Sequence, residues 1–71
     1  MNNEQIITAY AYLTIARIYK KRGKWMLDTP DYTEQFDTMG ELVDFVRYDL
    51  EIMKECIEPE LLEEAKAYAT R

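Results

Sequence analysis

The sequence predicts a single α+β domain over residues 1–71, with an antiparallel β-hairpin packed on one long α-helix, followed by a short C-terminal helix. Three observations predict this architecture. Apolar and polar residues alternate in the first half of the chain, a basic segment with a glycine separates two alternating runs, and apolar residues recur at spacings of three and four in the second half. The chain is close to the lower size limit for a domain that folds alone.

The first predicted strand covers residues 7–20, within the segment IITAYAYLTIARIY. Read as a strand, this segment places small and aliphatic side chains on one face and threonine and tyrosine side chains on the other. Its β-branched and aromatic residues also favour a strand, and its apolar residues form no clean helical stripe. A helix that begins near Asn3 is the alternative.

A three-residue loop over residues 21–23 is predicted to lead into a second strand at residues 24–29. In this loop Gly23 is expected to adopt the left-handed conformation. A two-residue loop is less favoured, because it would force Arg22 to a positive φ, which side chains resist. Residues 32–36 alternate again and provide a possible third strand. The three-residue loop over residues 21–23 sets the predicted register of the hairpin: Lys20 opposite Lys24, Tyr19 opposite Trp25, Ile18 opposite Met26 and Arg17 opposite Leu27.

The second half of the chain is predicted to be helical. Thr38 and Glu41 have the spacing of a capping box, which begins a helix over residues 39–57. Pro59 is expected at the first position of a second helix, over residues 59–70.

The composition argues against an enzyme. The chain has no histidine and one cysteine, which excludes imidazole catalysis, histidine-ligated metal sites and an internal disulfide. Its two glycines form no phosphate-binding loop, and Cys56 is expected to be a buried thiol on the long helix. We therefore expect a protein without catalytic residues, cofactor or metal. With no membrane-spanning run and no signal-peptide pattern, it is expected in the cytoplasm, that of the host cell if a phage encodes it.

Charge is distributed unevenly along the chain. The net charge is −5, yet residues 17–24 carry five basic and no acidic side chains. Residues 28–64 carry thirteen acidic against two basic side chains, a local net charge of −11. Most of the molecule is therefore expected to repel polyanions, while the tip of the hairpin attracts them.

The acidic face of the long helix is the first candidate binding surface. Its carboxylates are expected to imitate nucleic-acid phosphates and to occupy a basic groove on a larger host protein. The chain is similar in size, charge and mixed fold to small acidic proteins of phages and mobile elements, including anti-CRISPR and anti-restriction proteins. This similarity implies a non-enzymatic inhibitor or regulator; a solubilising helix face is the alternative. The candidate residues are Asp37, Glu41, Asp44, Tyr48, Glu51, Glu55 and Glu58.

The sheet face that the helices leave open is the second candidate. It is expected to be rich in tyrosine and to mediate homodimerisation or a partner contact, unless the C-terminal helix covers it. Its residues are Tyr10, Tyr12, Thr14, Ile18 and Met26.

The basic hairpin tip is the third candidate and makes a nucleic-acid-binding module the alternative function. The segments IYKKRGKWMLDT and FDTMGELVDFV resemble the small DNA-binding domains at the start of phage-type integrases, which implies a three-stranded sheet followed by a helix. The competing interpretation is a solvated tip whose lysines discourage edge-to-edge pairing of sheets. The candidate contacts are Arg17, Lys20, Lys21, Arg22 and Lys24.

Overall fold

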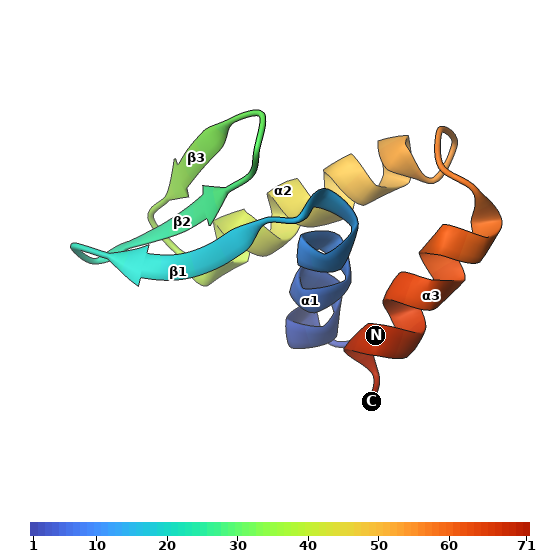
Figure 1. Cartoon of the computed structure of the whole chain (residues 1–71). Coiled ribbons are helices and arrows are strands. Elements are labelled where there is room, and N and C mark those ends of the chain that lie inside the picture. Colours follow the sequence, from blue (N-terminus) through green and yellow to red (C-terminus); the bar gives the residue numbers. More distant parts are fainter.

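The computed structural model describes all residues from 1 to 71 and has the α+β class that the sequence predicts (Figure 1). A three-stranded antiparallel sheet and three helices follow one another as α1–β1–β2–β3–α2–α3. The elements are α1 (Asn3–Thr14), β1 (Arg17–Lys21), β2 (Lys24–Asp28), β3 (Thr33–Phe36), α2 (Met39–Met53) and α3 (Pro59–Ala69).

The first predicted strand is wrong over most of its length, and the alternative helix beginning near Asn3 is confirmed. Only the last part of residues 7–20 lies in a strand, β1. A reciprocal capping box begins the helix: the Asn2 side chain accepts a 2.8 Å hydrogen bond from the Gln5 N–H, and the Gln5 side chain accepts one of 2.9 Å from the Asn2 N–H. These bonds satisfy backbone donors that a helix start otherwise leaves free.

Helix α1 accommodates the residues that favoured a strand. The hydroxyls of Thr8 and Thr14 donate to carbonyl oxygens four residues earlier, so the threonines are satisfied within the helix. The buried side chains also lie at helical spacing on one side. They are Ile6, Ile7, Ala9 and Tyr10.

Helix α1 ends at an unusual residue. Ile15 adopts the left-handed conformation, with φ 55° and ψ 41°, and the residue is 79% exposed. A β-branched residue pays a steric penalty in this region. The conformation turns the chain from α1 into β1.

The hairpin between β1 and β2 has a two-residue loop instead of the predicted three-residue loop. Arg22 and Gly23 both have positive φ, 52° and 78°, as in type I′ turns, whose twist matches that of the flanking strands. The match of twist therefore outweighs the resistance of Arg22 to positive φ. The register shifts by one residue from the predicted one: Lys21 pairs with Lys24, Lys20 with Trp25, Tyr19 with Met26, Ile18 with Leu27 and Arg17 with Asp28.

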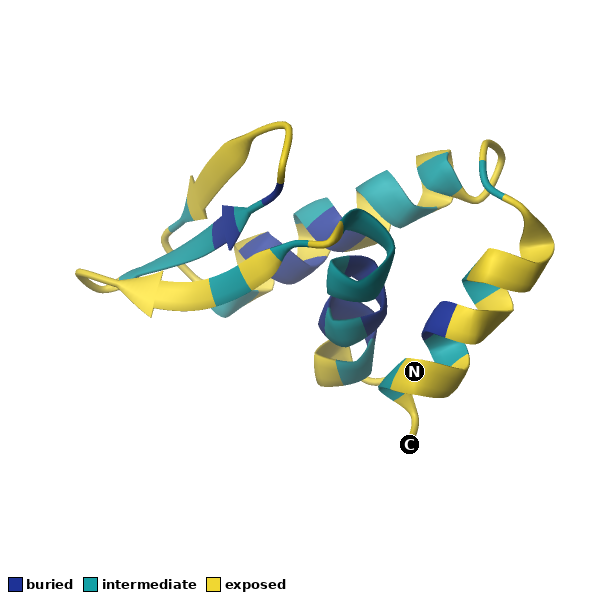
Figure 2. Cartoon of the chain, viewed as in Figure 1, coloured by how far each residue is buried: buried dark blue, intermediate teal, exposed yellow.

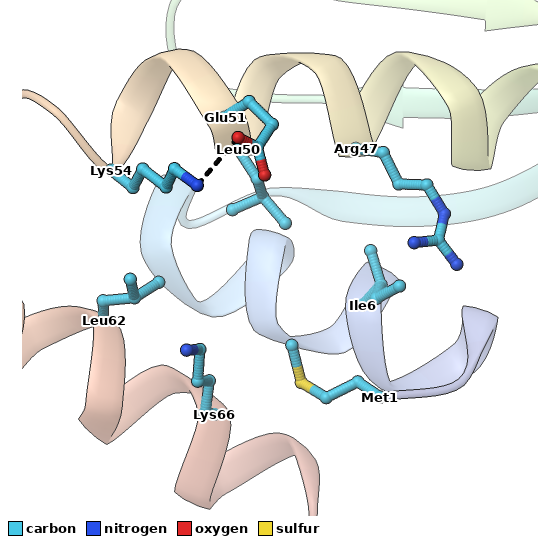
Figure 3. Close-up of a pocket in the computed structure, with 8 residues that line it drawn as sticks. All are labelled: Met1, Ile6, Arg47, Leu50, Glu51, Lys54, Leu62 and Lys66. Carbon is cyan, nitrogen blue, oxygen red and sulfur yellow. Dashed lines mark ion pairs between the residues drawn. The ribbon is translucent and has the colours of Figure 1, made fainter.

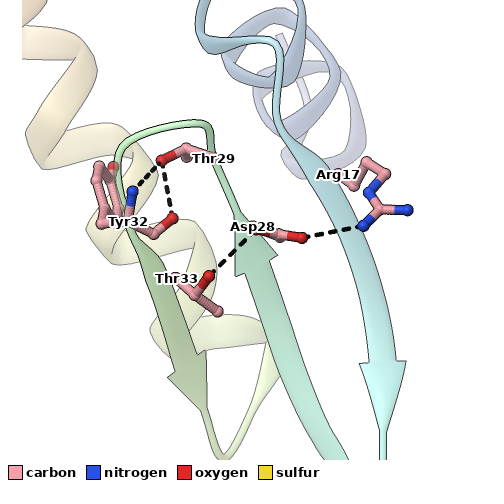
Figure 4. A network of polar contacts seen from close by, with 5 residues as sticks. All are labelled: Arg17, Asp28, Thr29, Tyr32 and Thr33. Carbon is pink, nitrogen blue, oxygen red and sulfur yellow. Dashed lines mark hydrogen bonds and ion pairs between the residues drawn. The ribbon is translucent and has the colours of Figure 1, made fainter.

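The third strand is confirmed and pairs with β2 through a turn organised by Thr29 (Figure 4). The Thr29 hydroxyl accepts a 2.9 Å hydrogen bond from the Tyr32 N–H and donates one of 2.8 Å to the Tyr32 carbonyl. Next to the turn, the Asp28 carboxylate accepts from the Thr33 hydroxyl at 3.1 Å and pairs with Arg17 at 3.1 Å. Asp28 therefore connects all three strands.

The core lies where α1, β2 and α2 meet. Leu27, on the central strand, is fully buried against both helices. The sheet face that carries Leu27 therefore points to the helices, whereas β1 and β3 are largely exposed (Figure 2). The buried cluster consists of Ile6, Ile7, Tyr10, Leu27, Leu42, Val43 and Val46.

The second half of the chain follows the prediction with two differences. Helix α2 ends at Met53, four residues earlier than predicted, and tight turns lead to Pro59, which begins α3 as expected. Cys56 lies in these turns and is exposed, because the helical phase that would have buried it has ended. At the start of α2 the Thr38 hydroxyl caps the Glu41 N–H at 3.1 Å, while the Glu41 carboxylate accepts from Asp37 instead of Thr38.

Candidate interaction site

The outward side of α2 carries carboxylates around two exposed apolar side chains. Tyr48 is 67% exposed and Ile52, one turn further along, is 48% exposed. Both lie opposite the buried stripe that packs on the core, because residues three, four and seven apart share one side of a helix. We call this surface the acidic face of α2; it consists of Glu41, Asp44, Tyr48, Glu51 and Ile52.

Most of the negative charge on this face is not neutralised within the chain. Glu51 pairs with Lys54 at 2.8 Å, and its hydrogen bond and charge raise the pKa of the Lys54 ammonium. Asp44 and Glu41 form no ion pair. The face therefore offers free carboxylates to a cationic partner beside an exposed aromatic ring.

The other predicted acidic residues lie outside α2. Asp37 precedes α2 and forms an ion pair with Lys24 of the hairpin. Glu55 lies in the turns after α2, and Glu58 is the residue before α3, where its side chain makes no capping bond. The carboxylates thus continue past the end of α2 without forming one helical row.

The predicted tyrosine-rich sheet face does not exist. Tyr10, Tyr12 and Thr14 lie on α1, and Tyr10 is fully buried. Ile18 lies opposite Leu27 and therefore faces the core, because a register shift of one residue moves a side chain to the other face. Of the predicted set, only Met26 lies on the open side of the sheet.

The open side of the sheet is basic and polar instead. Two of its cations are neutralised, since Arg17 pairs with Asp28 at 3.1 Å and Lys24 pairs with Asp37. The outer sheet face, as we call it, consists of Arg17, Tyr19, Lys21, Lys24, Met26, Asp28, Thr33 and Gln35.

The hairpin tip is the most basic part of this region. Lys21 and Arg22 form no ion pair. Lys20 lies on the other face, with its ammonium 5.5 Å from the centre of the Trp25 ring. A hollow of about 360 Å³ at the tip is lined by Lys21, Arg22, Lys24, Met26 and Gln35.

A polar network inside the fold was not predicted. The buried Tyr10 hydroxyl donates a 2.6 Å hydrogen bond to the Asp49 carboxylate and lies 2.6 Å from the Tyr32 hydroxyl. Burial, followed by these two hydrogen bonds, raises the pKa of Tyr10 far above its ordinary value. Tyr10 therefore stays protonated at neutral pH and joins α1 to α2; it is poorly suited to act as a base or nucleophile.

The structure contains no group of three or more acidic or cysteine side chains arranged to hold a metal ion. None of its helices combines the length and the apolar character that a membrane-crossing segment needs.

The comparisons add no relative from which a function can be transferred. No protein-family model matches the chain, and neither a curated protein nor a solved structure shows significant similarity to it. The surfaces of the molecule are therefore the only basis for a proposed function.

Proposed function

We propose that this chain is a small non-enzymatic interaction domain that binds the basic groove of a larger protein through the acidic face of α2. The observation that carries the proposal is the exposure of Tyr48 on the same side of α2 as Glu41 and Asp44, which form no ion pair in the chain. Exposed tyrosine is typical of the residues that dominate binding energy at protein interfaces. The surrounding carboxylates supply complementarity to a basic partner and speed its association.

The acidic face suits a partner that ordinarily binds nucleic acid. Its carboxylates would take the place of phosphates, so the domain would act as an inhibitor or regulator by competition. An origin in a phage or mobile element, an anti-CRISPR or anti-restriction role, homodimerisation and a cytoplasmic location remain predictions from the sequence.

A charge-reversal experiment tests this function. The wild-type protein and the double variant Asp44→Lys/Tyr48→Ala are used to capture partners from the native host, with Glu60→Lys as a matched control because Glu60 is an exposed acid on α3 without an ion pair. We expect wild type and control to retain the same protein, in a salt-sensitive manner, and the double variant to lose it. Equal retention by all three proteins would exclude the acidic face as the binding site.

A nucleic-acid-binding module is the second candidate, favoured by the uncovered, basic outer sheet face and its hollow at the hairpin tip. It predicts DNA or RNA binding that weakens with salt. The test is a fluorescence anisotropy titration of a labelled duplex at low salt, with Lys21→Glu/Arg22→Glu as the variant and Lys54→Glu as the control. A flat titration of the wild-type protein would exclude this function.

A further inference from the structure

We infer that the cavity between α1, α2 and α3 binds a small amphipathic carboxylate, with an apolar body and one anionic end (Figure 3). The cavity has a volume of about 470 Å³, within the usual range for small-molecule sites. It is separate from the acidic face of α2, except that Glu51 belongs to both. Its lining residues are Met1, Ile6, Arg47, Leu50, Glu51, Lys54, Leu62 and Lys66.

The cavity exists because α3 packs on α1 and diverges from α2 (Figure 1). Ala65 of α3 is fully buried, and the Tyr12 ring of α1 packs on Tyr68 with centroids 4.9 Å apart. The Tyr12 hydroxyl also donates a hydrogen bond to Glu64. These contacts fix α3 against α1 and leave a space beside α2.

The inner part of the cavity is apolar. Ile6 is almost fully buried at the side of α1, while Leu50 and Leu62 are half-buried on α2 and α3. Side chains from three helices therefore offer apolar surface to one ligand. Binding of an aliphatic or aromatic ligand there removes apolar surface of both the ligand and the cavity wall from water, which is favourable.

The charges around the cavity select an anion. Three of its eight lining residues are basic and one is acidic, in a chain of net charge −5. One nitrogen of Arg47 contacts the Asn3 side-chain oxygen at 3.1 Å, which leaves other guanidinium donors free. The ion pair between the Lys66 ammonium and the Glu63 carboxylate is long, at 3.6 Å. The Lys66 ammonium points toward the cavity in Figure 3.

A singly charged carboxylate fits these groups better than a polyphosphate. The guanidinium of Arg47 has the planar geometry that binds a carboxylate through two hydrogen bonds. Lys54 is already paired with Glu51 at 2.8 Å, so only Arg47 and Lys66 supply positive charge to a ligand in the cavity. The acidic remainder of the chain would repel a highly charged anion.

A titration with three probes tests the inference on the wild-type protein. The probes are inorganic phosphate and, below micelle-forming concentrations, decanoate and decanol. The chemical shifts of the backbone amides are followed by NMR. We expect saturable shifts at Ile6, Leu50 and Leu62 with decanoate, binding at least about tenfold weaker with decanol, and no shifts at these residues with phosphate. Equal binding of decanol and decanoate, or no saturation with decanoate, would overturn the inference.

A pair of variants tests the role of the cations. Arg47→Gln/Lys66→Gln removes two positive charges from the cavity, and Lys21→Gln/Arg22→Gln removes two from the hairpin tip. We expect the first variant to bind decanoate at least about tenfold more weakly than wild type and the second to bind it as wild type does. Equal affinities of the two variants, both folded by circular dichroism, would contradict the inference.

Discussion

The Tyr10 hydroxyl of α1 donates a 2.6 Å hydrogen bond to the Asp49 carboxylate of α2, across 39 positions of sequence. The Tyr32 hydroxyl, from the turn before β3, lies 2.6 Å from the same Tyr10 oxygen. Since the Tyr10 proton is donated to Asp49, Tyr32 is the donor to Tyr10. These two bonds connect three separate segments at the edge of the core.

Replacement of Tyr10 by phenylalanine tests this network. The variant keeps the ring in the core but removes the partner of Asp49, and we expect a loss of about 1–3 kcal/mol in the free energy of unfolding. Urea denaturation measures it. Tyr12→Phe is the control, because it removes a hydroxyl that bonds to Glu64 at the surface; we expect a smaller loss. Equal losses in the two variants would show that the buried network contributes no more to the free energy of unfolding than the surface hydrogen bond does.

The pH dependence of stability provides an independent test of the same residue. Because the pKa of Tyr10 is raised in the folded protein, the unfolded chain loses this proton near pH 10 while the folded chain keeps it. The contribution of Tyr10 is therefore complete below about pH 10 and declines above it, by at most about 1.4 kcal/mol per pH unit.

Urea denaturation of wild type and Tyr10→Phe between pH 8 and pH 11 measures this decline. The two proteins differ only in the Tyr10 hydroxyl, so the difference between their stabilities isolates Tyr10. We expect the stability difference to shrink as the pH rises above 10. A difference that stays constant would contradict the assignment of the raised pKa to Tyr10.

Relief of backbone strain at Ile15 is expected to stabilise the protein. Ile15→Gly removes the steric cost of a left-handed β-branched residue, about 1–2 kcal/mol, partly offset by the greater entropy of glycine in the unfolded chain. The side chain is mostly exposed, so little packing is lost. We expect a net gain of about 0.5–1 kcal/mol, seen as a higher Tm in a thermal melt. Ala16→Gly, next to it but outside the left-handed region, should lower the Tm instead.

The parts of the fold that were predicted have local signals. Gly23 precedes β2, Thr38 precedes α2 and Pro59 begins α3. Each of these residues acts through its own backbone geometry or a bond to a near neighbour. Such signals can be recognised without knowing the rest of the fold.

Residues 7–14 form a helix although the sequence predicts a strand, because their pattern is compatible with both periods. Alternation is visible in the sequence, but the side chains at helical spacing form an equally good buried set once α2 is present to cover them. The local signal that decides the matter is the Asn2–Gln5 capping box. The partners of Tyr10 are distant in sequence, so no local pattern indicates the network.

The candidate site was predictable in part. Glu41, Asp44 and Glu51 lie off the apolar stripe of α2, which predicts that they face outward, and all three are exposed. The cavity beside α2 was not predictable, because it depends on where α2 ends and how α3 diverges. These are tertiary features.

The hairpin register yields a prediction that separates the observed loop from a three-residue loop. In the observed register Ile18 faces the core opposite Leu27, and Tyr19 faces outward opposite Met26. Ile18→Ala is therefore expected to cost about 1–2 kcal/mol, less than a fully buried isoleucine, and Tyr19→Ala about 0.5 kcal/mol or less, as at other surface sites. Urea denaturation of both variants measures the two costs. A three-residue loop exchanges the two faces, so a larger cost at Tyr19 than at Ile18 would show that the strands pair in the other register.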